Sequence, residues 1–126
     1  MSQFLLWKQT GFFTERFITI EKYNDKNQNK VFTISVYYTG SSWEFLESIA
    51  IRTDDKVIKL SPTTSPYREI EQGGVEERLT IALPKNVLLC ILQCKSLTLQ
   101  YYCRYSTSPI DIPMDGLQRL KEFISL

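Results

Sequence analysis

Histidine is absent from this chain of 126 residues. Its absence removes the Ser–His and Cys–His pairs that activate the nucleophile in many hydrolases. It also removes the most common protein ligand of zinc, copper and iron. Catalysis by aspartate, glutamate, lysine or tyrosine stays open, so the sequence leaves enzymatic activity uncertain and favours a protein without one.

Cysteine is scarce, and its spacing is not that of a metal site. The three cysteines are Cys90, Cys94 and Cys103, and no two of them form a C-x-x-C pair. We interpret them as reduced, buried thiols that pack as small apolar side chains. A disulfide to Cys103 stays open if the protein is exported. We expect no metal ion and no cofactor.

Excess charge and long apolar runs are also missing. Fifteen basic and fourteen acidic residues give a net charge of +1, so we expect no nucleic-acid partner, which would need a basic face. No apolar run approaches the roughly 20 residues of a membrane helix, so we expect no integral membrane segment. The apolar cluster from Phe4 to Trp7 is too short for a secretory signal. We therefore expect a cytoplasmic protein, or an exported one if the natural chain begins before Met1.

What the chain does contain is enough apolar material for one packed domain over residues 1–126. Hydrophobic residues make up 43% of the sequence and aromatic residues 13%, which is typical of globular domains and not of disordered chains. A chain of this length buries roughly two thirds of its unfolded surface on folding. The domain therefore needs no disulfide or metal to hold its core together.

Residues 75–105 have the clearest pattern. Apolar residues alternate from Val75 to Leu83, which predicts a strand with one buried face. Pro84 ends that strand and can begin a helix, predicted over residues 85–95. A second strand follows, and its predicted core-facing residues are Leu97, Leu99, Tyr101, Cys103 and Tyr105.

Further elements follow from the same periodicities. Residues 13–23 and 31–38 predict an antiparallel hairpin around a polar turn. Residues 43–52 alternate except at Glu47, which indicates a bulge, with a helical turn over 43–48 as the alternative. A short strand at 57–60 completes a second hairpin, and another short strand is predicted at 68–72. Residues 1–13 read as a leader or edge segment, 106–111 as a loop, and 113–125 as a closing helix.

The predicted fold is mainly β: an antiparallel β-sandwich or open barrel with two short helices, at about 85–95 and 113–125. A pleckstrin-like barrel with a C-terminal helix is the alternative. The pattern V-x-E-x-L-x-I-x-L-P, then C-K-S-L-T-L-Q-Y-Y, then G-L-x-x-L-K-x-F resembles small bacterial β-sandwich domains of uncharacterised function. The resemblance implies a fold type and assigns no catalytic residue.

Three groups of residues are candidates for a site. Glu77 shares the parity of the core-facing residues of its strand, so it needs an Arg, Lys or Tyr partner there. With Tyr101 it is the best guess for a catalytic pair. Phe4, Trp7, Phe12 and Phe13 could form an interaction patch. Lys22, Lys26 and Lys30 are the only candidates for a membrane-surface site.

These candidates support three functional hypotheses. The first is a non-catalytic interaction or ligand-binding module, whose partner is an unknown protein or a second copy of this chain. The second is a carboxylate- and tyrosine-dependent hydrolase or isomerase. The third is a membrane-surface or phosphoinositide binder.

Overall fold

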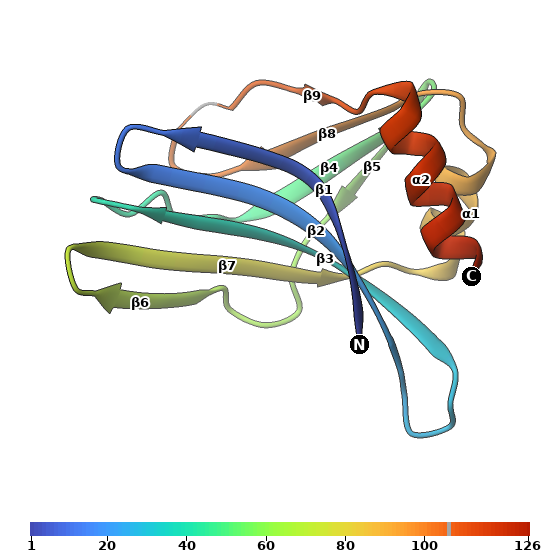
Figure 1. Cartoon of the computed structure of the whole chain (residues 1–126), viewed down its shortest axis with the longest axis horizontal. Coiled ribbons are helices and arrows are strands. Elements are labelled where there is room, and N and C mark those ends of the chain that lie inside the picture. Colours follow the sequence, from blue (N-terminus) through green and yellow to red (C-terminus); the bar gives the residue numbers. More distant parts are fainter. Residues whose placement is uncertain (106) are drawn as a thin grey trace.

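The computed structural model describes residues 1–105 and 107–126, which form two antiparallel sheets and two helices (Figure 1). The five-stranded sheet has the order β1 (Ser2–Gly11), β2 (Thr14–Asn24), β3 (Lys30–Gly40), β7 (Gly74–Ala82) and β6 (Tyr67–Glu71). The four-stranded sheet has the order β5 (Lys56–Leu60), β4 (Ser48–Thr53), β8 (Leu97–Tyr102) and β9 (Ile110–Asp111). The helices are α1 (Lys85–Gln93) and α2 (Met114–Ser125).

The predicted fold class is confirmed. Both predicted hairpins form, β2 with β3 and β4 with β5, and both helices end within two residues of their predicted limits. The pleckstrin-like barrel is wrong, because the described strands stay in two separate sheets that do not close on each other. No helix in the described part of the chain is long and apolar enough to cross a membrane.

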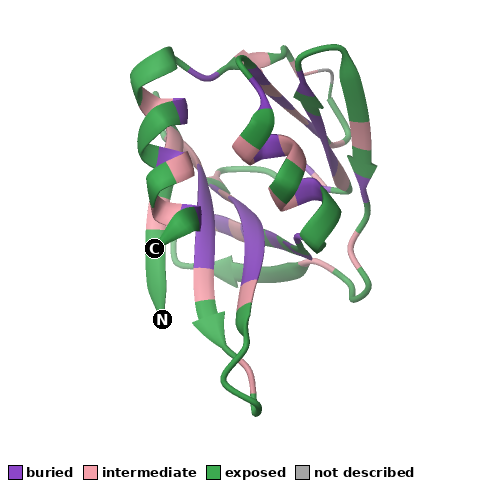
Figure 2. Ribbon diagram, turned by 90° about the vertical axis from the view of Figure 1, so that its right-hand side faces the viewer, coloured by how far each residue is buried: buried purple, intermediate pink, exposed green. Residues whose placement is uncertain are grey.

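The core lies between the two sheets and beneath the helices. Strands β7 and β8 bury alternate residues, whereas β2 and β3 bury consecutive residues in their middle parts, and β6 buries none. The buried stretches are visible on the ribbons (Figure 2). Ile34, Ile81 and Leu99 are each 5% exposed or less, as the alternation predicts. Burying such a side chain contributes about 1.5–3 kcal/mol to the stability of the fold. The buried residues of both sheets and both helices form one cluster.

Helix α2 covers one part of the gap between the sheets. Its buried stripe is Leu117, Leu120 and Ile124, and the rings of Phe4 on β1 and Phe123 lie 5.6 Å apart between centroids. Lys22 Nζ on β2 donates a hydrogen bond to the Phe123 carbonyl at 2.9 Å. These contacts fix α2 against the N-terminal half of β1 and leave the other half of that strand uncovered.

Three local predictions are wrong or incomplete. The segment at 1–13 forms a complete strand, β1, with a register shift between Leu5 and Trp7 that obscures its alternation. Residues 43–47 are neither strand nor helical turn, and β4 begins only at Ser48. Strand β8 ends at Tyr102, so the alternation does not extend to Tyr105, whose side chain is 52% exposed instead of buried. Ser106, in the predicted loop, lies outside the described residues.

Candidate binding cleft between the sheets

An open cleft of about 900 Å³ lies where the two sheets diverge, beyond the part of the gap that α2 covers. One wall is formed by the second half of β1 and the start of β2. The other wall is the segment at 107–113, which follows β8 and contains β9. Its floor carries polar and aromatic side chains. The residues that contribute to these surfaces include Trp7, Gln9, Thr14, Arg16, Tyr38, Glu44, Tyr101, Tyr105 and Asp111.

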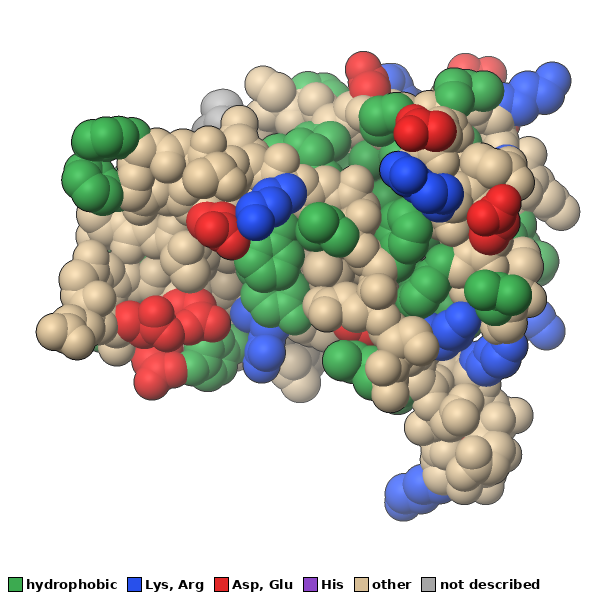
Figure 3. All heavy atoms as spheres, viewed as in Figure 1, with side chains coloured by type: hydrophobic (Ala, Val, Ile, Leu, Met, Phe, Trp, Pro, Cys, Tyr) green, Lys and Arg blue, Asp and Glu red, His purple; other side chains and the backbone are tan. Residues whose placement is uncertain are grey.

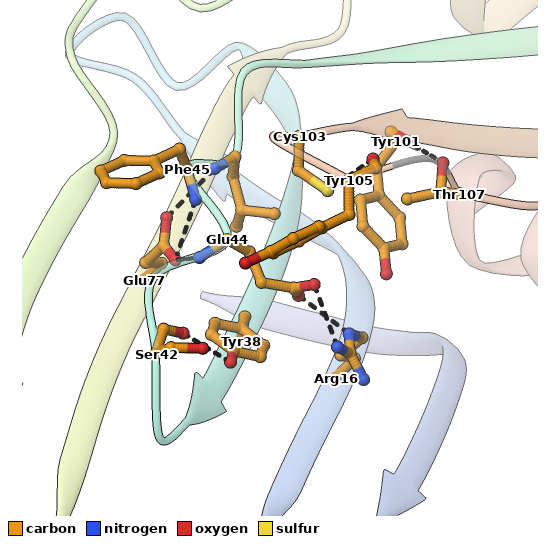
Figure 4. Close-up of polar contacts among 11 residues, drawn as sticks. Arg16, Tyr38, Ser42, Glu44, Phe45, Glu77, Tyr101, Cys103, Tyr105 and Thr107 are labelled. Carbon is orange, nitrogen blue, oxygen red and sulfur yellow. Dashed lines mark hydrogen bonds and ion pairs between the residues drawn. The ribbon is translucent and has the colours of Figure 1, made fainter.

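A bidentate ion pair forms the centre of the floor. Arg16 Nε donates to Glu44 Oε1 at 2.9 Å, and Arg16 Nη2 donates to Glu44 Oε2 at 3.0 Å (Figure 4). The two side chains are only 20% and 8% exposed, and the Glu44 carboxylate raises the pKa of Arg16. The guanidinium carbon also lies 5.1 Å from the centre of the Tyr38 ring. Because the guanidinium and the carboxylate act as hydrogen-bond donor and acceptor for each other, the pair has a fixed position in the cleft.

Aromatic residues surround this ion pair. The rings of Trp7 and Tyr101 lie 6.3 Å apart between centroids, and burial raises the pKa of Tyr101 to about 12. Burial also raises the pKa of Tyr38, whose hydroxyl donates to the Ser42 carbonyl at 2.7 Å. The two phenols are therefore neutral near pH 7, and they offer the cleft hydroxyl groups and ring edges instead of charge.

Glu77 lies behind the floor and holds the segment that carries Glu44. Its carboxylate has no exposed surface and accepts hydrogen bonds from the backbone N–H groups of Glu44, Phe45 and Leu46, at 2.7, 3.2 and 3.0 Å (Figure 4). Arg68 Nε lies 3.4 Å from the same carboxylate. These bonds explain why residues 43–47 leave the strand pattern, and why Phe45 has a φ of 57°.

The predicted pairing of Glu77 with a cation is observed, but the pair Glu77 and Tyr101 is not brought together. Tyr101 lines the cleft, whereas Glu77 is not among the lining residues. The described contacts of Glu77 are to residues 44–46 and Arg68. A ligand in the cleft would therefore contact Tyr101 and would reach Glu77 only through the backbone of the 43–47 segment.

The predicted aromatic patch divides into two parts. Phe4 and Trp7 are half-buried and pack against the core. Phe12 and Phe13, at the turn between β1 and β2, are 89% and 79% exposed. Figure 3 shows hydrophobic side chains at the end of the molecule where β1 turns into β2. Only Trp7 among the four lines the cleft.

Two of the three lysines proposed for a membrane surface contact the C-terminal end of the chain at α2. Lys22 Nζ donates to the Phe123 carbonyl, and Lys30 Nζ donates to the Leu126 carbonyl. Lys22 also lies 4.5 Å from the centre of the Phe123 ring. Two of the three candidate lysines therefore have intramolecular partners.

Sequence reasoning missed Arg16 and Glu44, which dominate the cleft. One signal was available for Arg16: it shares the parity of Ile18 and Ile20 on β2, so its side chain faces inward and needs a partner. No comparable signal exists for Glu44, because its position depends on hydrogen bonds to a residue 33 positions away. The ion pair itself joins positions 28 apart in the chain.

A second buried carboxylate, Glu21, lies on the opposite face of the five-stranded sheet. Its Oε1 accepts hydrogen bonds from the hydroxyls of Thr33 and Ser35, both at 2.7 Å, and its Oε2 accepts one from Thr19. Ser35 also contacts the Thr80 hydroxyl at 2.9 Å. Side chains of β2 and β3 thus satisfy this carboxylate, and Thr80 of β7 joins the network through Ser35. Glu21 does not line the cleft.

Comparisons with known proteins add a distant structural likeness. No protein-family model and no curated protein matches the chain. Among solved structures, the crystal structure of invasion associated protein B from Bartonella henselae is similar over 94% of this chain and 95% of that one, with 11% sequence identity and a TM-score of 0.36. A likeness at this level carries no argument about function.

Proposed function

We propose that this chain is a non-catalytic binding module whose ligand occupies the cleft between the two sheets. The observation that carries the proposal is the Arg16–Glu44 pair, held on the cleft floor by two hydrogen bonds of 2.9 and 3.0 Å. Ligand sites in proteins are typically concave and preformed, with a few fixed polar groups among apolar ones. The cleft volume of about 900 Å³ lies within the usual range for such sites.

The burial and the hydrogen bonds of the polar groups in and behind the cleft favour binding over catalysis. A general acid or base works best when its pKa is near the working pH and when it can reach the substrate. Tyr101 has a pKa of about 12, Glu44 is bound at both oxygens by Arg16, and Glu77 is enclosed. Each group is thus suited to orient a ligand or to hold the floor in place.

A fragment screen by two-dimensional amide NMR tests the proposal. The ¹⁵N-labelled full chain is titrated with a library of small polar and aromatic fragments. We expect several fragments to shift the amide signals of cleft residues, with Trp7, Arg16 and Tyr101 among them. Shifts scattered over the surface, or none at all, would contradict the proposal.

A matched pair of variants makes the test specific. Gln9 is exposed and lines the cleft, so Gln9→Trp places an indole ring inside it. Gln118 is exposed on α2 and is not a lining residue, so Gln118→Trp adds the same ring elsewhere. We expect Gln9→Trp to weaken fragment binding by about tenfold or more and Gln118→Trp to leave it unchanged. Equal binding to both variants would count against the cleft as the site.

A further inference from the structure

The edge of β1 indicates what kind of ligand the cleft accepts. From it we infer that the ligand is an extended peptide segment of a partner protein, which adds as a strand to the open half of β1. This inference rests on the proposed function and identifies the chemical class of the ligand. Three observations support it. The outer edge of β1 is unpaired, residues 7–11 of that edge border the cleft, and the segment at 107–113 forms the opposite wall.

Strand β1 ends the five-stranded sheet and pairs only with β2. In the described part of the chain, no backbone hydrogen bond joins β1 to any other element. Every second residue of an antiparallel edge strand points its N–H and C=O groups away from its neighbour. The outer side of β1 therefore presents a row of free donors and acceptors, which is the surface that an added strand uses.

Only the second half of this edge is accessible from the cleft. In the first half, Phe4 packs against Phe123, so α2 lies over the inner face of β1 there. Trp7 and Gln9, beyond the bulge, line the cleft. The open stretch at residues 7–11 spans about 17 Å at roughly 3.4 Å per residue, which accommodates a peptide segment of about five residues.

The opposite wall is held in place by hydrogen bonds to β8 and its flanking residues. The Thr107 carbonyl accepts a hydrogen bond from Gln100 Nε2 at 2.9 Å, and the Thr107 hydroxyl donates to the Tyr101 carbonyl. Further along, Ile110 and Asp111 pair with β8. A second copy of this chain would place its own β2 beside an added β1, where this wall lies. An isolated peptide strand has no such neighbour, so the geometry favours it.

The side chains of the cleft suggest a preference within that class. Side chains of an added strand alternate between its two faces, so one face would meet Trp7, Tyr101 and the Arg16–Glu44 pair. At the rim, Asp111 is exposed and its Oδ1 accepts a hydrogen bond from Thr98 at 2.9 Å, which leaves Oδ2 for a basic side chain. We expect bound peptides to combine an apolar or aromatic residue with a lysine or arginine.

The probe is a phage-displayed library of random 12-residue peptides, selected on the full chain. The selected peptide is then synthesised, together with copies that carry a single N-methyl group at each successive position. Because an N-methyl group removes one backbone donor and leaves the side chains intact, strand addition predicts an alternating pattern. Methylation at every second position of the bound segment weakens binding by about tenfold or more, while the positions between change it less.

Hydrogen exchange provides the second readout. Bound peptide should slow the exchange of alternate amides at residues 7–11 and leave the amides at the covered end of β1 unchanged. Gln9→Trp should abolish peptide binding, and Gln118→Trp should retain it. Alternating N-methyl effects together with this protection support the inference.

Three results would overturn the inference. The first is a peptide that binds equally well in all its N-methylated forms. The second is a selection that yields no peptide, and the third is a dimer in sedimentation whose β1 amides are protected without any peptide. If the fragments still shift the cleft signals in these cases, the proposed binding function stands and only the peptide class fails. If fragments and peptides both fail, the cleft itself is excluded.

Discussion

Replacing Glu77 with glutamine removes a charge that has no exposed surface and keeps the shape of the side chain. The carboxylate accepts three backbone N–H groups from residues 44–46 and faces Arg68 Nε at 3.4 Å. An amide has one oxygen, which can retain two of these four donors, and its NH₂ group then faces the other two. Glu77→Gln therefore leaves buried donors without acceptors.

The expected loss of stability follows from that count. A buried donor without an acceptor costs about 1–3 kcal/mol, and partial relaxation of the 43–47 segment reduces the total for two donors. We expect Glu77→Gln to lower the free energy of unfolding by about 2–4 kcal/mol, a large part of the roughly 5–15 kcal/mol of a typical domain. Urea unfolding would then shift to a midpoint lower by about 1–2 M.

The control is Glu76→Gln, at the neighbouring position of β7 and half-buried on its other face. The carboxylate of Glu76 raises the pKa of Glu71, so removing this charge relieves a repulsion. We expect the free energy of unfolding to change by no more than about 0.5 kcal/mol. Urea curves followed by tryptophan fluorescence compare the two variants with the parent chain. A loss below about 1 kcal/mol for Glu77→Gln, or an equal loss for Glu76→Gln, would refute the assigned hydrogen bonds.

Three further predictions concern the cleft and the β1–β2 turn. A double-mutant cycle of Arg16→Met and Glu44→Gln, measured by urea unfolding, should give a coupling energy of about 1 kcal/mol or more, and additive effects would show that the pair contributes nothing. Burial raises the pKa of Tyr101 to about 12. The neutral phenol therefore stabilises the fold below about pH 10, and this stabilisation is lost as the pH rises to about 12. Tyr101→Phe should therefore lose less stability over that interval, and identical pH profiles would contradict this. Phe13 has a φ of 62°, so Phe13→Asn should stabilise the chain by about 0.5–1 kcal/mol in thermal unfolding, whereas Phe12→Asn should not.

Local periodicity was enough to predict most of the architecture. Strand β7 alternates from Val75 to Ala82 without a break, and its buried residues are those that the pattern indicates. The β2–β3 hairpin is equally clear, because a polar turn separates two β-rich runs. Pro84 at the N-terminus of α1 marked where strand changes to helix. In each case neighbours in the sequence determine the structure, so the sequence alone is informative.

The features that were missed depend on contacts between distant residues. The bulge between Leu5 and Trp7 shifts the alternation of β1 by one residue, so neither half of the strand gives a clean pattern. The 43–47 segment follows the carboxylate of Glu77 instead of its own periodicity. The cleft combines residues of β1, β2, β3 and β8, of the loop at 41–44 and of the 107–113 segment, and no local pattern reports which of their side chains meet.

The order of the strands has a consequence for a nascent chain. Strand β3 pairs on its far side with β7, so Ile34 meets Ile81 only after the whole of β4, β5 and β6 has been synthesised. Similarly, Ile51 of β4 must await Leu99 of β8. During translation the first three strands would have their apolar face uncovered, with only the local β1–β2 and β2–β3 turns to hold them. Pairings as distant as β3 with β7 form slowly. Production of this protein should therefore be sensitive to the speed of elongation and to chaperones that shield apolar strands from aggregation.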